Sequence, residues 1–110
     1  MATLQIVDNK ANLNVDTVEA FYTAPQGQDV VIESFTASNT STVNASYSAY
    51  IQTLTGGLQP QVPFKIVVWG ENDLGIGIVN QVIPPGGSLK FETSAINSIY
   101  FTVPGRTIDN

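Results

Sequence analysis

Apolar and polar residues alternate with a period of two along most of the chain. The alternation is clearest in residues 45–52, 88–92 and 98–103. Successive side chains of a β-strand point to opposite faces, so this pattern predicts strands with one buried face. Apolar residues at helical spacing are absent, and the chain is therefore expected to be all-β.

Residues 64–69 depart from this alternation because they are apolar on both faces, with Lys65 as the exception. A strand that is apolar on both faces is typical of the centre of a covered sheet. It is equally expected where the outer face of a strand meets a partner. The sequence leaves both possibilities open.

Four further strands are predicted with less regular patterns. They cover residues 4–7, 13–22, 30–37 and 76–83. The apolar face switches near residues 16–18 in the second of them, which a bulge or a bend between sheets would cause. Glu33 interrupts the apolar face of the third.

Turn-forming residues separate these strands about every ten positions. Pro25 and Gly27 precede one strand, and the run from Pro84 to Gly87 forms a tight reversal in which Gly86 and Gly87 allow positive φ. Seven to eight short strands with such spacing predict an antiparallel β-sandwich or a jelly-roll-like barrel. We expect a single domain over residues 1–110, with short terminal segments.

The composition excludes several kinds of chemistry. The chain has no cysteine and no histidine, which removes Ser-His-Asp and Cys-His catalysis and most zinc and iron sites. Four basic residues against nine acidic ones give a net charge of −5, which argues against binding a nucleic-acid backbone. No enzyme activity, cofactor or metal is expected.

Charged residues are scarce, at 12% of the chain, so the surface must be rich in Ser, Thr, Asn and Gln. Residues 36–51 carry no charge at all. This composition fits an ordinary β-domain, and it equally fits a surface that a partner covers, because interface cores are depleted in charge. The sequence shows neither a membrane-spanning stretch nor a signal peptide, and we expect assembly in a cytoplasm.

Two groups of residues are candidates for binding. Glu71 and Asp73 flank Asn72 in a loop and offer oxygen ligands, but a calcium loop needs more carboxylates, so a solvated turn is favoured. The aromatic residues could stack on sugar rings or contact a protein. Packing across strands is favoured for Tyr47 and Trp69. Tyr50 and Tyr100 lie on the polar sides of their strands, and their role stays open.

Three pieces of sequence together resemble small virion proteins of tailed bacteriophages. They are YTAPQG at residues 22–27, SNTS at residues 38–41 and VIPPGGSL at residues 82–89. The resemblance spans roughly residues 22–91, and the Gly-Asp stretch common after the last turn is missing from residues 92–99. It implies a β-sandwich that assembles as a trimer or ring and serves as a capsid decoration, neck, collar or tail accessory protein.

The resulting hypothesis is a non-catalytic, homo-oligomeric virion protein, assembled in the host cytoplasm, that binds capsid, neck or tail proteins through low-charge sheet and terminal surfaces. Nucleic acid and membranes are not expected as partners. The residues selected for contact are Tyr50, Trp69 and Tyr100, with Asn39 and Asn44 at the rim. The alternative hypothesis is a carbohydrate-binding or receptor-binding module on a tail or fibre, which would bind a glycan.

Overall fold

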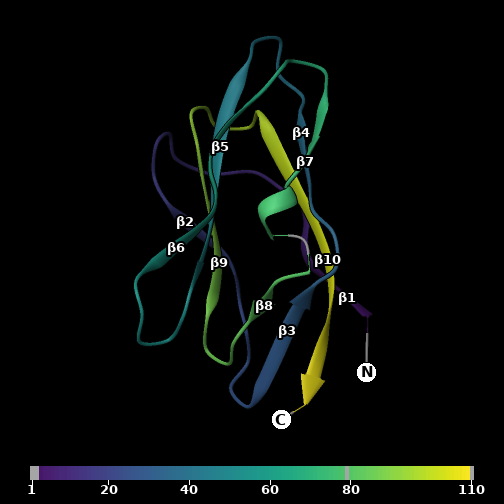
Figure 1. Ribbon diagram of the computed structural model, residues 1–110. Coiled ribbons are helices and arrows are strands. Elements are labelled where there is room, and N and C mark those ends of the chain that lie inside the picture. Colours follow the sequence, from purple (N-terminus) through teal and green to yellow (C-terminus); the bar gives the residue numbers. More distant parts are fainter. Residues whose placement is uncertain (1–2, 79, 110) are drawn as a thin grey trace.

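The computed structural model describes residues 3–78 and 80–109, which form two packed antiparallel sheets (Figure 1). The elements in chain order are β1 (Thr3–Lys10), β2 (Glu19–Thr23), β3 (Gln28–Ile32), β4 (Thr36–Asn39), β5 (Ala45–Gln52), β6 (Leu58–Val67), β7 (Asn72–Leu74), the 3₁₀ helix η1 (Ile76–Ile78), β8 (Val82–Ile83), β9 (Ser88–Thr93) and β10 (Ile99–Asp109). The prediction of an all-β sandwich is confirmed.

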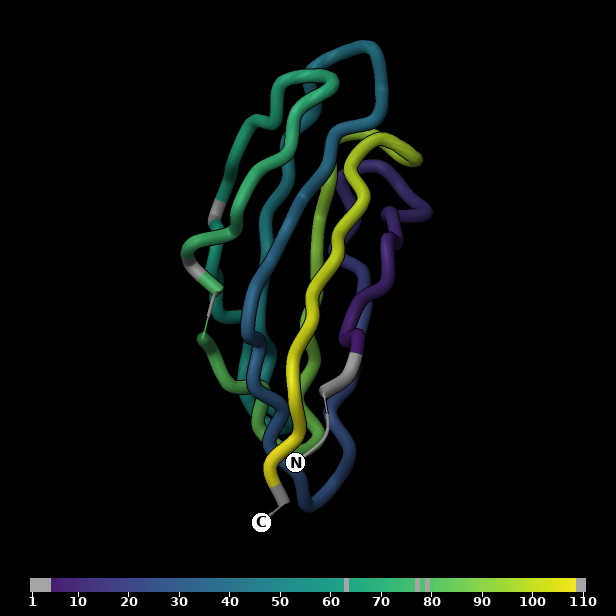
Figure 2. The backbone as a smooth tube through the Cα atoms, turned by 90° about the vertical axis from the view of Figure 1, so that its right-hand side faces the viewer, coloured from purple at the N-terminus to yellow at the C-terminus, as the bar shows by residue number. Residues whose placement is uncertain are grey.

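The first sheet, called sheet A, is organised around the long strand β10. The first part of β10 pairs with β4 and its last part pairs with β3, so β3 and β4 lie end to end along one edge of β10. Strand β1 pairs with the other edge. Figure 2 shows β10 in yellow between β1 in purple and the β3–β4 segment in blue. Strands β7 and β8 continue the sheet outside β4 and β3.

The second sheet, called sheet B, has the strand order β2-β9-β5-β6. When β3–β4 and β7–β8 are each counted as one interrupted strand, sheet A has the order β1, β10, β3–β4, β7–β8. In each sheet, a strand from the start of the chain, β1 or β2, lies beside a strand from its end, β10 or β9. This strand order is that of a jelly roll, which consists of two Greek keys. The jelly-roll alternative of the predicted fold is therefore the one that the structure adopts.

The core lies between the sheets and is rich in aromatic rings. Phe91 of sheet B stacks on Phe101 of sheet A, with ring centroids 3.9 Å apart. Phe35 and Tyr47 extend the cluster, and Phe21 meets it edge-on. All of these except Phe21 are fully or almost fully buried, and the alternation along β5, β9 and β10 correctly predicted the inward face of Tyr47, Phe91 and Phe101.

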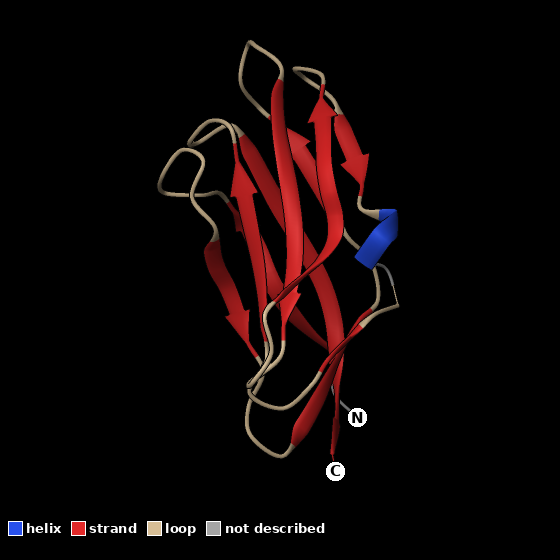
Figure 3. Cartoon of the chain, turned by 60° about the vertical axis from the view of Figure 1, so that its left-hand side comes forward, coloured by secondary structure: helices blue, strands red, loops and turns tan. Residues whose placement is uncertain are grey.

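Two predicted strands are interrupted in the structure. The strand expected at residues 30–37 breaks after Ile32, and Phe35 turns into the core before β4 begins. The strand expected at residues 76–83 is replaced by η1, which is the blue element in Figure 3, followed by the short strand β8. One contact links both changes: a Cβ atom at Gly75 would collide with the ring of Phe35. The chain can pass this ring only because residue 75 is glycine.

The strand expected at residues 13–22 is also shorter than predicted, because residues 11–18 form a loop and only β2 is extended. Buried Asn12 holds this loop by donating to the carbonyl of Phe91 at 3.0 Å. The carboxylate of Glu19 accepts the backbone N–H groups of Leu13 and Asn14. Desolvation raises the pKa of Glu19, but these hydrogen bonds and Lys10 outweigh it and leave the pKa below its ordinary value.

The reversal at residues 84–87 forms as predicted, with Gly86 at a φ of +78°. It does not close a hairpin, however. Strand β8 before it belongs to sheet A and β9 after it belongs to sheet B. The turn therefore carries the chain from one sheet to the other.

Candidate interaction surface

Strand β6 lies at the edge of sheet B. Within residues 3–78 and 80–109, it pairs with β5 and with no other strand. Of the two possibilities that the sequence left open for residues 64–69, the central strand is therefore wrong. The other possibility, an outer face that meets a partner, stays a prediction.

The outward side chains of β6 form an apolar ridge, which we define as Phe64 and Ile66. Phe64 is 67% exposed and Ile66 is 60% exposed. Ile66 lies directly opposite Ser46 of β5, whose side chain also faces outward. Val68 follows in the same alternation and is exposed as well. Large apolar side chains thus stand side by side in solvent along one edge of the sheet.

A shallow hollow of about 240 Å³ lies beside the ridge on the outer face of sheet B. It is lined by Asn44, Ala45, Ser46, Phe64, Ile66 and Ser94. The residues contributed by β5, β9 and their flanking loops are small and uncharged. The uncharged stretch at residues 36–51 therefore supplies much of the floor of this hollow.

The inward side of β6 carries a charge, Lys65, besides the buried core residues Val62 and Val67. Lys65 lies opposite Tyr47 in the β5–β6 register, and its amine is 2.9 Å from Oδ1 of Asp73 on β7. The Tyr47 hydroxyl donates to Oδ2 of Asp73 at 2.8 Å. Burial and the neighbouring Asp73 raise the pKa of Tyr47 well above its ordinary value, so the phenol stays neutral. These contacts connect sheet B to sheet A beside the edge strand.

Asp73 therefore has protein partners, and the calcium interpretation of its loop gains no support. No group of three or more potential ligands that could hold a metal ion exists among the described residues. In that same part of the chain, no helix has the length and apolarity that crossing a membrane requires.

The structure corrects the placement of Asn39, which was selected for the rim of a contact surface. Its side chain is 1% exposed. The amide nitrogen donates to the carbonyls of Val43 and Val67, and the amide oxygen accepts from the backbone and hydroxyl of Ser41. Asn39 thus holds the turn after β4 against the end of β6, and it offers no side-chain atom to a partner.

The other four selected residues do not form one surface. Asn44 lines the hollow and accepts the backbone N–H of Trp69, so these two residues are neighbours. Tyr50 is half-buried on the outer face of sheet B, where its hydroxyl donates to Glu92. Tyr100 lies on β10 and belongs to sheet A. Trp69 is 58% exposed, so the prediction that its ring packs across strands is wrong.

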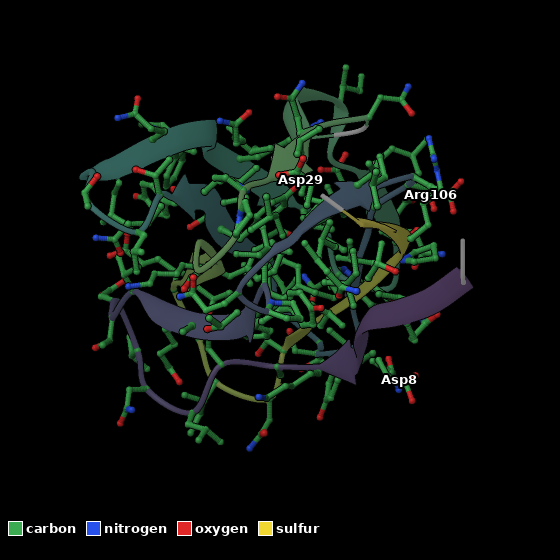
Figure 4. All side chains as sticks on the ribbon, turned by 90° about the horizontal axis from the view of Figure 1, so that it is seen from below. Asp8, Asp29 and Arg106 are labelled. Atoms are coloured by element: carbon green, nitrogen blue, oxygen red, sulfur yellow. The ribbon has the colours of Figure 1, made fainter. Side chains whose placement is uncertain are left out.

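Charges are distributed unequally over the two sheets. Among the outward-facing residues of β5, β6 and β9, Lys90 and Glu92 are the charged ones, and they cancel. Asp8, Asp29 and Arg106 come from β1, β3 and β10, all strands of sheet A (Figure 4). The outer face of sheet B beside the ridge is therefore neutral, although the chain carries a net charge of −5.

One end of the sandwich also exposes apolar residues. Four loops, at residues 11–18, 40–44, 68–71 and 94–98, meet at the end opposite to both termini (Figure 2). Each of these loops carries at least one large apolar side chain in solvent, namely Leu13, Val15, Val43, Val68, Trp69 and Ile96. We call this surface the loop end.

Sequence reasoning selected neither Phe64 nor Ile66, although their signal was visible as the run that is apolar on both faces. Comparison of the chain with protein-family models, with curated proteins and with solved structures finds no match.

Proposed function

We propose that this chain is a non-catalytic structural protein of a tailed-phage virion, a homo-oligomeric capsid decoration or a neck or collar component. The sequence pieces at residues 22–27, 38–41 and 82–89 support the proposal through their resemblance to such proteins. The jelly roll supports it by analogy, because viral capsid proteins often use this architecture. Because one fold can host many functions, the proposal rests on the exposed residues of this surface.

The observation that carries the proposal is the apolar ridge on the outer face of edge strand β6. Burying a large apolar side chain contributes roughly 1.5–3 kcal/mol. Phe64 and Ile66 forgo most of that gain in the isolated chain. Large exposed apolar patches that are rimmed by polar residues mark interaction sites. A ridge beside a neutral, uncharged floor is the surface expected of a subunit that is covered in its assembled form.

An assembly subunit also needs a surface for the particle that it joins. We assign this role to the loop end, together with the terminal segments at the opposite end of the sandwich. The loop end combines the exposed apolar residues of four loops, among them Val43 and Trp69. It can therefore bury apolar area against capsid or neck proteins while the face of sheet B remains available for a different contact.

The direct test is quantitative mass spectrometry of density-gradient-purified phage particles whose genome encodes this chain. We expect the chain in the particles at a copy number that is a fixed multiple of a capsid or neck symmetry. Particles that contain all other structural proteins and lack this chain would overturn the proposal. The amount of unassembled chain in the lysate is measured as the control for chain that is carried over into the particle fraction without being part of the particles.

Carbohydrate binding is the second candidate, and the exposed ring of Trp69 beside Asn44 is the observation that favours it. Lectin domains also use jelly rolls, and indole rings stack on sugars. A glycan array with the wild type and with Trp69→Ala tests this function. Binding that Trp69→Ala abolishes would support it, and an array without binding would exclude it.

A further inference from the structure

We propose that the β6 ridge docks on a second copy of this chain across a two-fold axis, with Phe64 of each copy entering the hollow of the other. The inference rests on the proposed assembly role and specifies the partner that the neutral face of sheet B takes. It assigns Phe64 as the central contact residue and Ser46 as part of the receiving floor. Four features of the surface lead to this partner.

The first feature is that ridge and hollow lie side by side on the same face. A two-fold interface places the same patch of both copies against itself, so the patch must be complementary to itself. Phe64 and Ile66 project beside a depression whose floor includes Ser46. A two-fold axis that lies in the plane of the interface, parallel to this face, turns the second copy over and brings each ridge over the other copy's hollow.

The second feature is the size of the hollow. Its volume is about 240 Å³. A cavity of about 150 Å³ is large enough to hold benzene. The hollow is open to solvent rather than enclosed, and its volume leaves space for the ring of one Phe64 side chain laid into it. Aromatic residues in such receiving pockets are the residues that most often dominate the energy of an interface.

The third feature is charge. Two copies that each carry a net charge of −5 repel one another on most of their surface. The outer face of sheet B is an exception, because Lys90 and Glu92 leave it neutral. This face offers no excess charge to attract a strongly acidic or basic partner, and it lets a second copy approach without repulsion.

The fourth feature is the geometry of the edge. An exposed edge strand could also pair with another chain through its backbone. Pro60 and Pro63 lie within β6 and lack the N–H groups that such pairing needs, and Lys65 points inward on the same strand. Packing of the outer face of sheet B against the second copy is therefore the favoured contact. The molecule measures 44 × 26 × 21 Å, so a broad face can supply the roughly 800 Å² that each partner buries in a standard interface.

Sedimentation velocity over a concentration series tests this inference with matched variants. Phe64→Ser removes the ridge, and Leu74→Ser is the control because Leu74 is 63% exposed on sheet A. We expect a dimer for the wild type and for Leu74→Ser. For Phe64→Ser we expect the dissociation constant to rise at least about tenfold. Circular dichroism of each variant verifies that it is folded.

A second variant separates the ridge from the hollow. Ser46→Phe fills the floor and leaves Phe64 in place, and we expect it to weaken the dimer as Phe64→Ser does. A dimer that tolerates Ser46→Phe would overturn the insertion of Phe64, as would equal effects of Phe64→Ser and Leu74→Ser. A monomeric wild type would overturn the inference outright. None of these results changes whether the chain is found in purified virions, so a failure here is distinguishable from a failure of the proposed function.

Discussion

Strands β5 and β6 are neighbours in sheet B, yet their outward faces carry different kinds of residue. On β5 the apolar residues, such as Tyr47 and Ala49, face the core, and Ser46 faces outward. On the paired part of β6, Lys65 faces inward, whereas Phe64 and Ile66 face solvent. Val67 of β6 still faces the core, so the two strands differ in their outward faces, which are polar on β5 and apolar on β6.

The comparison shows that the two strands meet different requirements. The alternation on β5 is what folding of a single chain demands, because its inward side chains complete the core. Strand β6 adds Val62 and Val67 to that core, but its outward residues Phe64 and Ile66 add nothing. Its inward charge is compensated by Asp73, and its outward apolar residues gain only when another surface covers them. Substitutions of inward residues on β5 should therefore lower stability, whereas substitutions of outward residues on β6 should weaken assembly.

The largest effect is expected from Tyr47→Ala on β5. Tyr47 is almost fully buried and contacts the rings of Phe35 and Phe101. Truncation of a buried aromatic side chain leaves a cavity and costs about 3–5 kcal/mol of unfolding free energy. Urea denaturation followed by tryptophan fluorescence measures this loss. A loss below about 1 kcal/mol would contradict the assignment of Tyr47 to the core.

Asn39→Ala should have the next largest effect, because Asn39 connects the turn after β4 to the last residue of β6. The substitution leaves the carbonyls of Val43 and Val67 without their donor. Loss of such a buried partner costs about 1–3 kcal/mol. Asn44→Ala is the matched control, since Asn44 is exposed and should lose much less stability. Equal losses in both variants would show that Asn39 is not the structural residue described above.

The pH dependence of stability distinguishes the inward phenol of Tyr47 from an exposed one. The folded-state pKa of Tyr47 is raised above its ordinary value of 10.0, by burial first and by Asp73 second. Its contribution is thus fully present below pH 10 and is lost as the pH rises, because the unfolded chain ionises first. We expect the wild type to lose about 1.4 kcal/mol more per pH unit above 10 than Tyr47→Phe. Parallel stability curves from denaturation at pH 9–11 would contradict this.

The smallest effect on stability is expected from Phe64→Ala on β6. Phe64 is mostly exposed in the single chain, and substitutions at such positions usually change stability by less than about 0.5 kcal/mol. The measurement is denaturation at a concentration where the chain is monomeric. A loss comparable to that of Tyr47→Ala would mean that Phe64 contributes to the core, and the contrast between the outward faces of the two strands would disappear.

The fold could be predicted where the information is local. Alternation placed β5, β9 and β10 with the correct buried faces, and turn residues separated them. The break between β3 and β4 and the helix η1 could not be predicted, because they depend on Phe35 passing against Gly75 forty residues later in the chain. Their cause is a contact between distant residues, which a local pattern does not contain.

The candidate surface was predictable in part. The uncharged stretch at residues 36–51 and the apolar run at residues 64–69 each indicated a contact surface. Their adjacency could not be deduced, since it depends on the β5–β6 register. Asn39 was assigned to the surface because its residue type is usually exposed. Its acceptor on Val67, 28 residues away, made it a buried residue instead.

Light scattering of the wild-type chain over a concentration series tests most directly the central claim that assembly covers the outer face of β6. The account predicts a concentration-dependent approach to a stable mass of at least twice the 11.8 kDa of one chain. A mass of 11.8 kDa at every concentration would contradict it, because Phe64 and Ile66 would then remain in solvent without a second copy to cover them.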